Sequence, residues 1–194
     1  MESGQRALAF ARALGDFALE VSTNFYLGRT YHALGDYRRA IEALSLKALS
    51  PADEAAGERV GVRGNPSGSA RPWLVCSLAE IGAFAEGITR GKKVVQIAED
   101  ANVPVRLIGA YLGIEYLYVV EGDLSEAISQ LERGLELCRT WNFPGWLPPT
   151  ASALGFAYAL SGRITEALGL LEQAVEEATS MRLLISMLPG PASL

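Results

Sequence analysis

The sequence predicts an all-α protein built from stacked pairs of antiparallel helices. A short motif recurs four times: a glycine, an apolar residue two places on, and then a small residue followed by an aliphatic one. The four glycines are 47, 40 and 40 residues apart. An apolar helical stretch precedes each glycine, and a second turn marker recurs between the motifs. The motif occupies residues 35–41, 82–88, 122–128 and 162–168.

Each motif glycine is expected to end one helix, because glycine adopts the left-handed conformation that closes a helix C-terminus. Asp36 and Asp123 come next and are predicted N-caps, and Glu126 stands where a capping box needs it. The small residues of the motif are expected where two helix backbones cross closely. They are Ala40, Gly87, Ala127 and Ala167.

The second turn marker is Gly15, Asn102 or Asn142, three residues that align with one another in the repeat. Glycine and asparagine both tolerate the left-handed conformation. Each unit therefore has one turn marked by Gly and another marked by Asn or Gly.

This frame predicts one array over residues 1–182, with about nine helices. Its parts are a lone second helix of an incomplete unit at 5–15, unit 1 at 17–50, a loop insertion at 51–70, unit 2 at 71–101, unit 3 at 104–141 and unit 4 at 147–181. Pro189, Gly190 and Pro191 predict a frayed tail at 183–194.

Two of the units carry a family signature. Leu27-Gly28-x-x-Tyr31 with Gly35-Asp36-Tyr37 and Ala40, and Leu154-Gly155-x-x-Tyr158 with Gly162 and Ala167, resemble the tetratricopeptide repeat (TPR). The resemblance implies a right-handed superhelical solenoid whose concave groove binds a partner. The 40-residue period exceeds the ~34 residues of the standard unit. It is similar to the longer-period arrays attached to bacterial signalling ATPases, class III nucleotide cyclases and maltose-regulator-type activators.

Two positions depart from the TPR pattern. Glu115 stands where Gly28 and Gly155 supply a small residue, and Gly91 stands where the other units have leucine.

Composition excludes several classes. The net charge of −5, with both signs scattered along the chain, provides no basic stripe for nucleic acid. The first twelve residues carry no secretory signal, and prolines interrupt the uncharged stretch 142–162, so no membrane span is expected. Cys76 and Cys138 are interpreted as small apolar residues, which fits a reducing, cytoplasmic location.

No catalytic residue, cofactor site or metal site is predicted. His32 is the only histidine, so neither a metal-ligand set nor a catalytic triad can be assembled, and we expect it at the helix surface facing the groove. The glutamates of the second helices repeat with the unit and are expected on a solvated outer face. They are Glu42, Glu86, Glu126, Glu132, Glu136, Glu172, Glu176 and Glu177.

The remaining candidate is the groove, lined in TPR arrays by first-helix residues that point away from the second helix. Exposed aromatics beside an arginine would anchor a peptide; the competing interpretation is that these side chains pack between units. The candidates are Phe25, Arg29, His32, Cys76, Glu80, Leu112, Tyr116, Val119, Ser152 and Phe156.

The resulting hypothesis is a protein-interaction module of a bacterial signalling or regulatory protein, holding a peptide or protein partner. The alternative is a small-effector sensor domain; an enzyme is not expected. No polar capping repeat is evident, and the mean hydropathy is +0.18. Since solenoids end in polar caps, we expect either a piece of a longer array or self-association through its ends.

Overall fold

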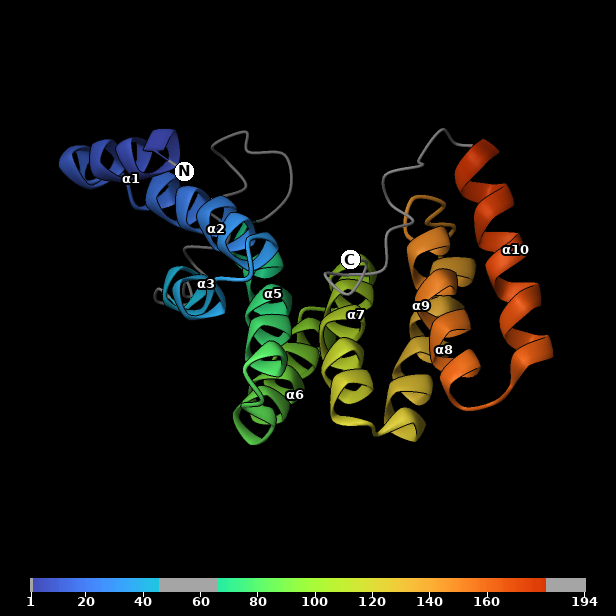
Figure 1. The fold of residues 1–194 in the computed structure, drawn as a ribbon. Helices are drawn as coiled ribbons and strands as arrows, with labels where there is room; N and C mark the ends of the chain where they lie inside the picture. Colours follow the sequence, from blue (N-terminus) through green and yellow to red (C-terminus); the bar gives the residue numbers. More distant parts are fainter. Residues whose placement is uncertain (1, 46–65, 181–194) are drawn as a thin grey trace.

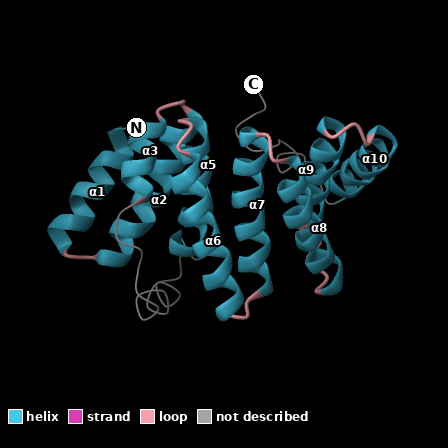
Figure 2. Cartoon of the chain, turned by 90° about the horizontal axis from the view of Figure 1, so that it is seen from below, coloured by secondary structure: helices cyan, strands magenta, loops and turns pink. Residues whose placement is uncertain are grey.

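The computed structural model describes residues 2–45 and 66–180, and every element within them is an α-helix (Figures 1 and 2). The helices are α1 (Glu2–Leu14), α2 (Phe17–Ala33), α3 (Tyr37–Leu44), α5 (Pro66–Glu80), α6 (Phe84–Asp100), α7 (Pro104–Glu121), α8 (Leu124–Thr140), α9 (Leu147–Leu160) and α10 (Ile164–Ser180). They follow one another across the molecule in chain order, as Figure 1 shows.

The predicted insertion at 51–70 lies largely outside the described residues, and so does the tail at 183–194. Helix α5 begins at Pro66, inside the segment expected to be a loop. Proline suits the first turn of a helix, because its missing N–H would have no intrahelical partner there.

The left-handed turns are confirmed at every predicted position. The four motif glycines have φ between +73° and +96°, Gly15 has φ +65°, and Asn102 and Asn142 both have φ +50°. These residues end the helices and fix where the chain reverses direction between one helix and the next.

Aspartate side chains cap three of the helices that follow these turns. Asp36 Oδ1 accepts from Arg39 N at 3.3 Å, and Asp123 Oδ1 accepts from Glu126 N at 3.2 Å. Asp16 caps α2 in the same way, because its Oδ1 accepts from Leu19 N at 2.9 Å, although it was not among the predicted N-caps. Each cap satisfies an N–H that has no partner within its helix.

The helix pairs stack through three hydrophobic clusters that cross the boundaries between units. The first joins α2 and α3 to α5, the second joins α5 to α7 and the start of α8, and the third joins α8 to α9 and α10. Successive first helices also touch one another, α2 against α5, α5 against α7 and α7 against α9. The core is therefore continuous along the array, as in repeat proteins generally.

Close helix crossings explain the small residues of the motif. Ala40, Ala127 and Ala167 are buried, and a Cβ added to Gly87 would overlap Leu117 of the next unit. A close helix crossing also explains the glycine at position 91, because a Cβ added to Gly91 would lie 2.8 Å from Ile114 Cγ1. At this boundary the side chains of α7 fill space that a leucine of the second helix fills in the other units.

One contact recurs in units 1 and 4 with its charges exchanged. In unit 1, Asp36 directly follows the motif glycine and pairs with Arg39, whose guanidinium lies 4.9 Å from the ring of Tyr31. In unit 4, the residue after the glycine is Arg163, which pairs with the acid three places on and lies 3.6 Å from the ring of Tyr158. Both units thus place an arginine over the last tyrosine of the first helix.

Candidate partner-binding surface

The first helices of units 1 and 2 carry a cation stacked between aromatic rings. Arg29 on α2 is exposed, and its guanidinium carbon lies 4.9 Å from the ring centroid of Trp73 on α5 and 5.6 Å from that of Phe25. Phe25 itself is buried, so it supports the arginine from below rather than offering surface. The two rings fix a long side chain that would otherwise be mobile, and leave its charge accessible.

His32 does not face the surface as expected; it is buried between units 1 and 2. Its ring meets Tyr37 and Trp73 edge-on, each at 5.3 Å between centroids, and its Nδ1 lies 2.9 Å from Ser77 Oγ. The prediction was wrong because a helical pattern shows which residues share one face of a helix, but not whether another helix covers that face. Here α5 packs over it.

The hydrogen bonds around Ser77 assign the proton of His32. Ser77 Oγ donates its single proton to Trp73 O at 2.8 Å, so it can only accept from His32, and Nδ1 carries the hydrogen. Nε2 is then a buried lone pair with no partner among the described residues. Burial lowers the pKa of His32, although the nearby Glu80 carboxylate opposes this, and a neutral imidazole results.

Glu80 and Tyr116 connect units 2 and 3. The phenol of Tyr116 on α7 donates a hydrogen bond to Glu80 Oε1 at the end of α5. Burial, followed by this hydrogen bond to a carboxylate, raises the pKa of Tyr116, so the phenol stays protonated. Both residues are half-buried and therefore remain partly available to a partner.

Cys76 is buried between α5 and α7, with its Sγ 3.9 Å from the carbonyl oxygen of Gly113. Burial is the main cause that raises the pKa of its thiol, and the nearby carboxyl groups of Glu115 and Glu80 add to it. The thiol is therefore protonated and shielded, which is opposite to what a reactive cysteine needs.

The remaining groove candidates lie on α7 and α9. Leu112 and Val119 are half-buried and pack against the cluster formed by α8, α9 and α10, and Ser152 is half-buried as well. Phe156 is exposed. Of the ten candidates, three are thus buried, namely Phe25, His32 and Cys76, whereas Arg29, the Glu80–Tyr116 pair, Ser152 and Phe156 keep accessible atoms.

Glu115 is an unusual acid that the sequence marked only as a departure from the small residue of the repeat. It is buried in α7, and burial is the sole cause that raises the pKa of its carboxyl to about 8. No hydrogen bond or ion pair compensates it within residues 2–45 and 66–180. The carboxyl is therefore mostly protonated and uncharged at neutral pH.

Two adjoining recesses lie elsewhere, between the second helices α8 and α10, with volumes of about 420 and 480 Å³. Their walls carry Glu132, Glu136, Glu166, Glu177 and Arg139, above an apolar floor that includes Leu154 and Leu170. None of the ten groove candidates lines either recess. These recesses could not be predicted from the sequence, because their glutamates repeat with the unit like those of an ordinary solvated helix face.

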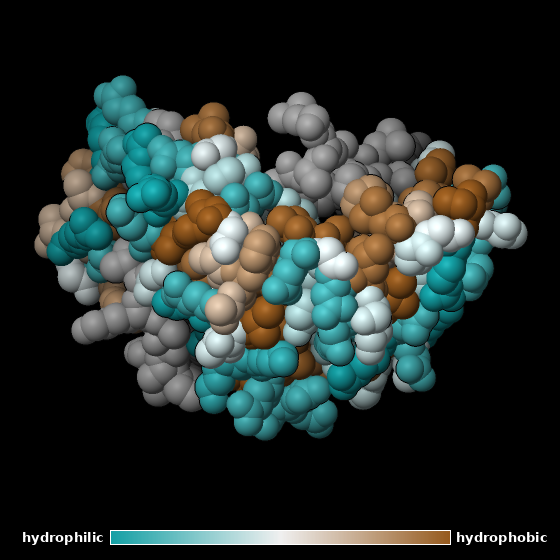
Figure 3. All heavy atoms as spheres, turned by 60° about the horizontal axis from the view of Figure 1, so that its bottom comes forward, coloured by the Kyte–Doolittle hydropathy of each residue, from teal (hydrophilic) through white to brown (hydrophobic). Residues whose placement is uncertain are grey.

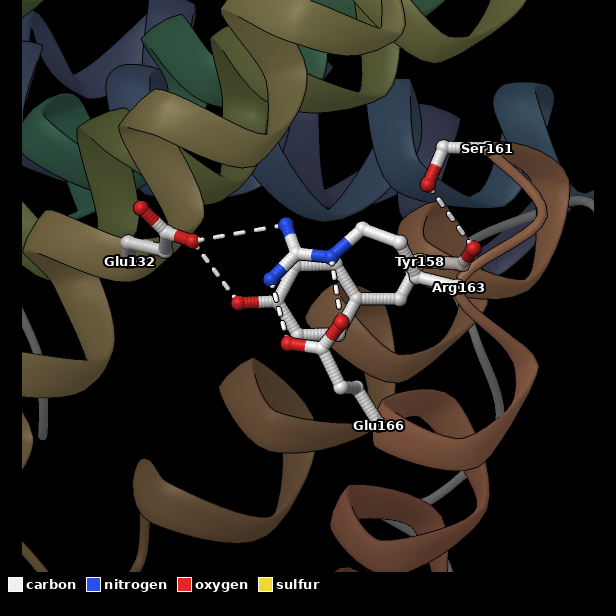
Figure 4. Close-up of polar contacts among 5 residues, drawn as sticks. All are labelled: Glu132, Tyr158, Ser161, Arg163 and Glu166. Atoms are coloured by element: carbon white, nitrogen blue, oxygen red, sulfur yellow. Dashed lines mark hydrogen bonds and ion pairs between the residues drawn. The ribbon is translucent and has the colours of Figure 1, made fainter.

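A polar cluster closes one side of the first recess (Figure 4). Tyr158 OH donates to Glu132 Oε1 at 2.7 Å, and Arg163 forms a two-point contact with Glu166 at 2.5 and 2.8 Å. Arg163 also lies 3.8 Å from Glu132 Oε1. The carboxylates of Glu132 and Glu166 are thus already bound to partners of their own chain.

Within the described ranges, no group of three or more acidic, histidine or cysteine side chains is placed to hold a metal ion. No helix there is both long and apolar enough to pass through a bilayer.

Comparison with known proteins supports the repeat assignment. A family model of the tetratricopeptide repeat matches residues 21–46, which comprise most of α2 and all of α3. No curated protein is similar enough in sequence to be matched.

Solved structures match over nearly the whole chain. A Rap protein complexed with Competence and Sporulation Factor is similar with a TM-score of 0.73 and 12% identity over 92% of this chain and 48% of its own. A putative kinesin light chain with TPR-like repeats from Podosopora anserina gives 0.62 and 18%, covering 93% and 86%. BtubC from P. vanneervenii gives 0.62 and 18%, covering 84% and 65%.

These likenesses confirm the predicted all-helical, TPR-like solenoid. At such low identity they show the fold alone. The chain spans about half the length of the Rap protein that it matches.

Proposed function

We propose that this chain is a protein-interaction scaffold that binds a peptide or protein segment along its first helices, α2, α5, α7 and α9. The observation that carries the proposal is the exposed Arg29, stacked on Trp73, one unit away from the half-buried Glu80–Tyr116 pair. A solved protein of the same fold, the Rap protein, carries a bound factor. That likeness also favours a role within a signalling or regulatory protein.

The chemistry of this face suits a polypeptide. Arg29 offers several N–H donors in a fixed plane to a carboxylate or a main-chain carbonyl. Further along, Tyr116 and Phe156 provide aromatic surface of the kind that dominates binding energy at interfaces. Because these groups stand on successive first helices, an extended segment that crosses the helices would meet all of them.

The test is a selection from a random peptide display library on the immobilised chain. We expect enriched peptides whose affinity falls by about tenfold or more in Arg29→Ala and in Tyr116→Ala, since truncating an interface anchor costs ~2 kcal/mol or more. Arg38→Ala is the matched control, because Arg38 is an exposed arginine on the second helix α3.

Tyr116→Phe separates the ring from the hydrogen bond, because it keeps the aromatic surface and loses only the phenol. Circular dichroism establishes that each variant is folded. The proposal is wrong if no peptide is enriched, or if the enriched peptides bind Arg29→Ala and Tyr116→Ala as well as they bind the Arg38→Ala control.

A further inference from the structure

The C-terminal helix of the array exposes large apolar side chains along one face. On α10, Ile164, Leu168 and Val175 are 54%, 55% and 53% exposed. Figure 3 shows hydrophobic residues at the right of the molecule, where α9 and α10 lie. We call these three residues the C-terminal face.

In the inner units, the residues equivalent to this face pack against the following unit. The counterparts of Leu168, one repeat apart, are Ile41, Ile88 and Ile128, and each packs against the hydrophobic cluster shared with the following unit. Leu135, the counterpart of Val175, is buried. The C-terminal face is therefore a stacking surface that nothing covers within the described part of the chain.

The N-terminal end has a surface of the same kind. The inner side of α1 packs on α2, where an added Cβ at Gly4 would lie 2.6 Å from Leu27 Cδ2. On its outer side Phe10 is 62% exposed and Leu14 is 75% exposed, and Arg6 is exposed one turn before Phe10. We call Arg6, Phe10 and Leu14 the N-terminal face.

Charge selects which surface can cover the C-terminal face. The exposed charges beside it on α10 are carboxylates, Glu172 and Glu176, and α10 contains no basic residue. Two C-terminal faces brought together would oppose like charges, which is costly at an interface. The N-terminal face instead brings Arg6 toward these carboxylates while Phe10 and Leu14 meet the apolar stripe.

We propose that copies of this chain assemble head to tail, with the N-terminal face of one copy packed on the C-terminal face of the next. The two faces lie at opposite ends of the array (Figure 1). A single copy cannot join them, so each contact leaves one face of each kind open for the next copy. Such a heterologous contact builds an open chain of copies instead of closing a symmetric dimer.

Sedimentation velocity and light scattering on the full chain test this proposal. The mean mass of the wild type is expected to rise past that of a dimer as concentration increases. Leu168→Glu blocks the C-terminal face and Phe10→Glu blocks the N-terminal face, so each variant alone is expected to be monomeric. An equimolar mixture of the two is expected to stop at a dimer, because only one productive contact remains. Ile81→Glu is the control that leaves assembly unchanged, because Ile81 is a 46% exposed apolar residue in the turn after α5, in mid-array.

A charge exchange provides a second test that avoids placing a charge in the apolar stripe. Arg6→Glu and Glu172→Lys should each weaken assembly, and a mixture of the two variants should partly restore it through the exchanged pair. A wild type that stays monomeric at all concentrations overturns the proposal, whether the C-terminal face stays open or is covered by residues outside the described ranges. A wild type that stops at a dimer, or an assembly that survives both Leu168→Glu and Phe10→Glu, overturns it equally.

Discussion

Replacing Glu115 with glutamine should make the protein more stable in alkaline solution. The native state holds a protonated carboxyl whose pKa is about 8, whereas the unfolded chain returns it to the ordinary 4.5. Between these values the native state binds more protons than the unfolded state, so the free energy of unfolding decreases as pH rises through this window. At ~1.4 kcal/mol for each pKa unit, the full loss is ~5 kcal/mol.

Glutamine resembles the protonated acid in size and cannot ionise. Glu115→Gln should therefore match the wild type near pH 4.5 and exceed its free energy of unfolding by several kcal/mol at pH 8 and above. This gain is a large share of the ~5–15 kcal/mol that stabilises a typical domain. Urea titrations followed by circular dichroism, repeated across this pH range, measure the difference.

The control is Glu121→Gln, which removes an exposed carboxyl from the end of the same helix. It should leave the pH dependence of the free energy of unfolding close to that of the wild type. If Glu115→Gln loses stability with rising pH as steeply as the wild type does, the carboxyl is not held neutral in the native state and the reasoning fails.

Two further predictions concern buried positions. Because burial lowers the pKa of His32 below its ordinary 6.5, stability should be complete above pH 6.5 and fall as pH decreases below it. Urea midpoints measured in the Glu115→Gln background should show this decrease in stability at acidic pH. Replacing His32 with glutamine should make the decrease smaller. Gly87→Ala should cost ~1–3 kcal/mol of stability through overpacking against α7. Gly169→Ala, where nothing lies within 4 Å, should instead stabilise the protein by ~0.5–1 kcal/mol; thermal melts in which both variants behave alike would contradict the close helix crossing.

The turns and helix crossings could be predicted from sequence because their causes are local. A residue type such as that of Asn102 indicates a left-handed backbone conformation at its own position. A small residue such as Ala127 indicates that two helices cross closely at that position. The helix pairs followed from these marks without any knowledge of distant contacts.

The exposure of individual first-helix residues could not be predicted in the same way. His32 and Cys76 occupy the predicted helix face, but α5 and α7 pack over them, and this overlap depends on how far one unit is rotated against the next. The recesses between α8 and α10 exist because these two helices do not touch each other and are separated in the chain by α9. Such a distance is not encoded in any one segment.

The exchanged arginine contact of units 1 and 4 has a consequence for how repeats of this kind are recognised. Asp36 and Arg163 occupy the same repeat position with opposite charge, yet both units set a guanidinium above a tyrosine. What the two units share is an interaction, and the position that supplies each partner is free to change. A sequence profile scores residue types column by column, so it records this exchange as two mismatches. A repeat array can in this way keep the same three-dimensional contacts in units whose sequences differ, such as unit 4 and the unit at residues 21–46 that the family model matches.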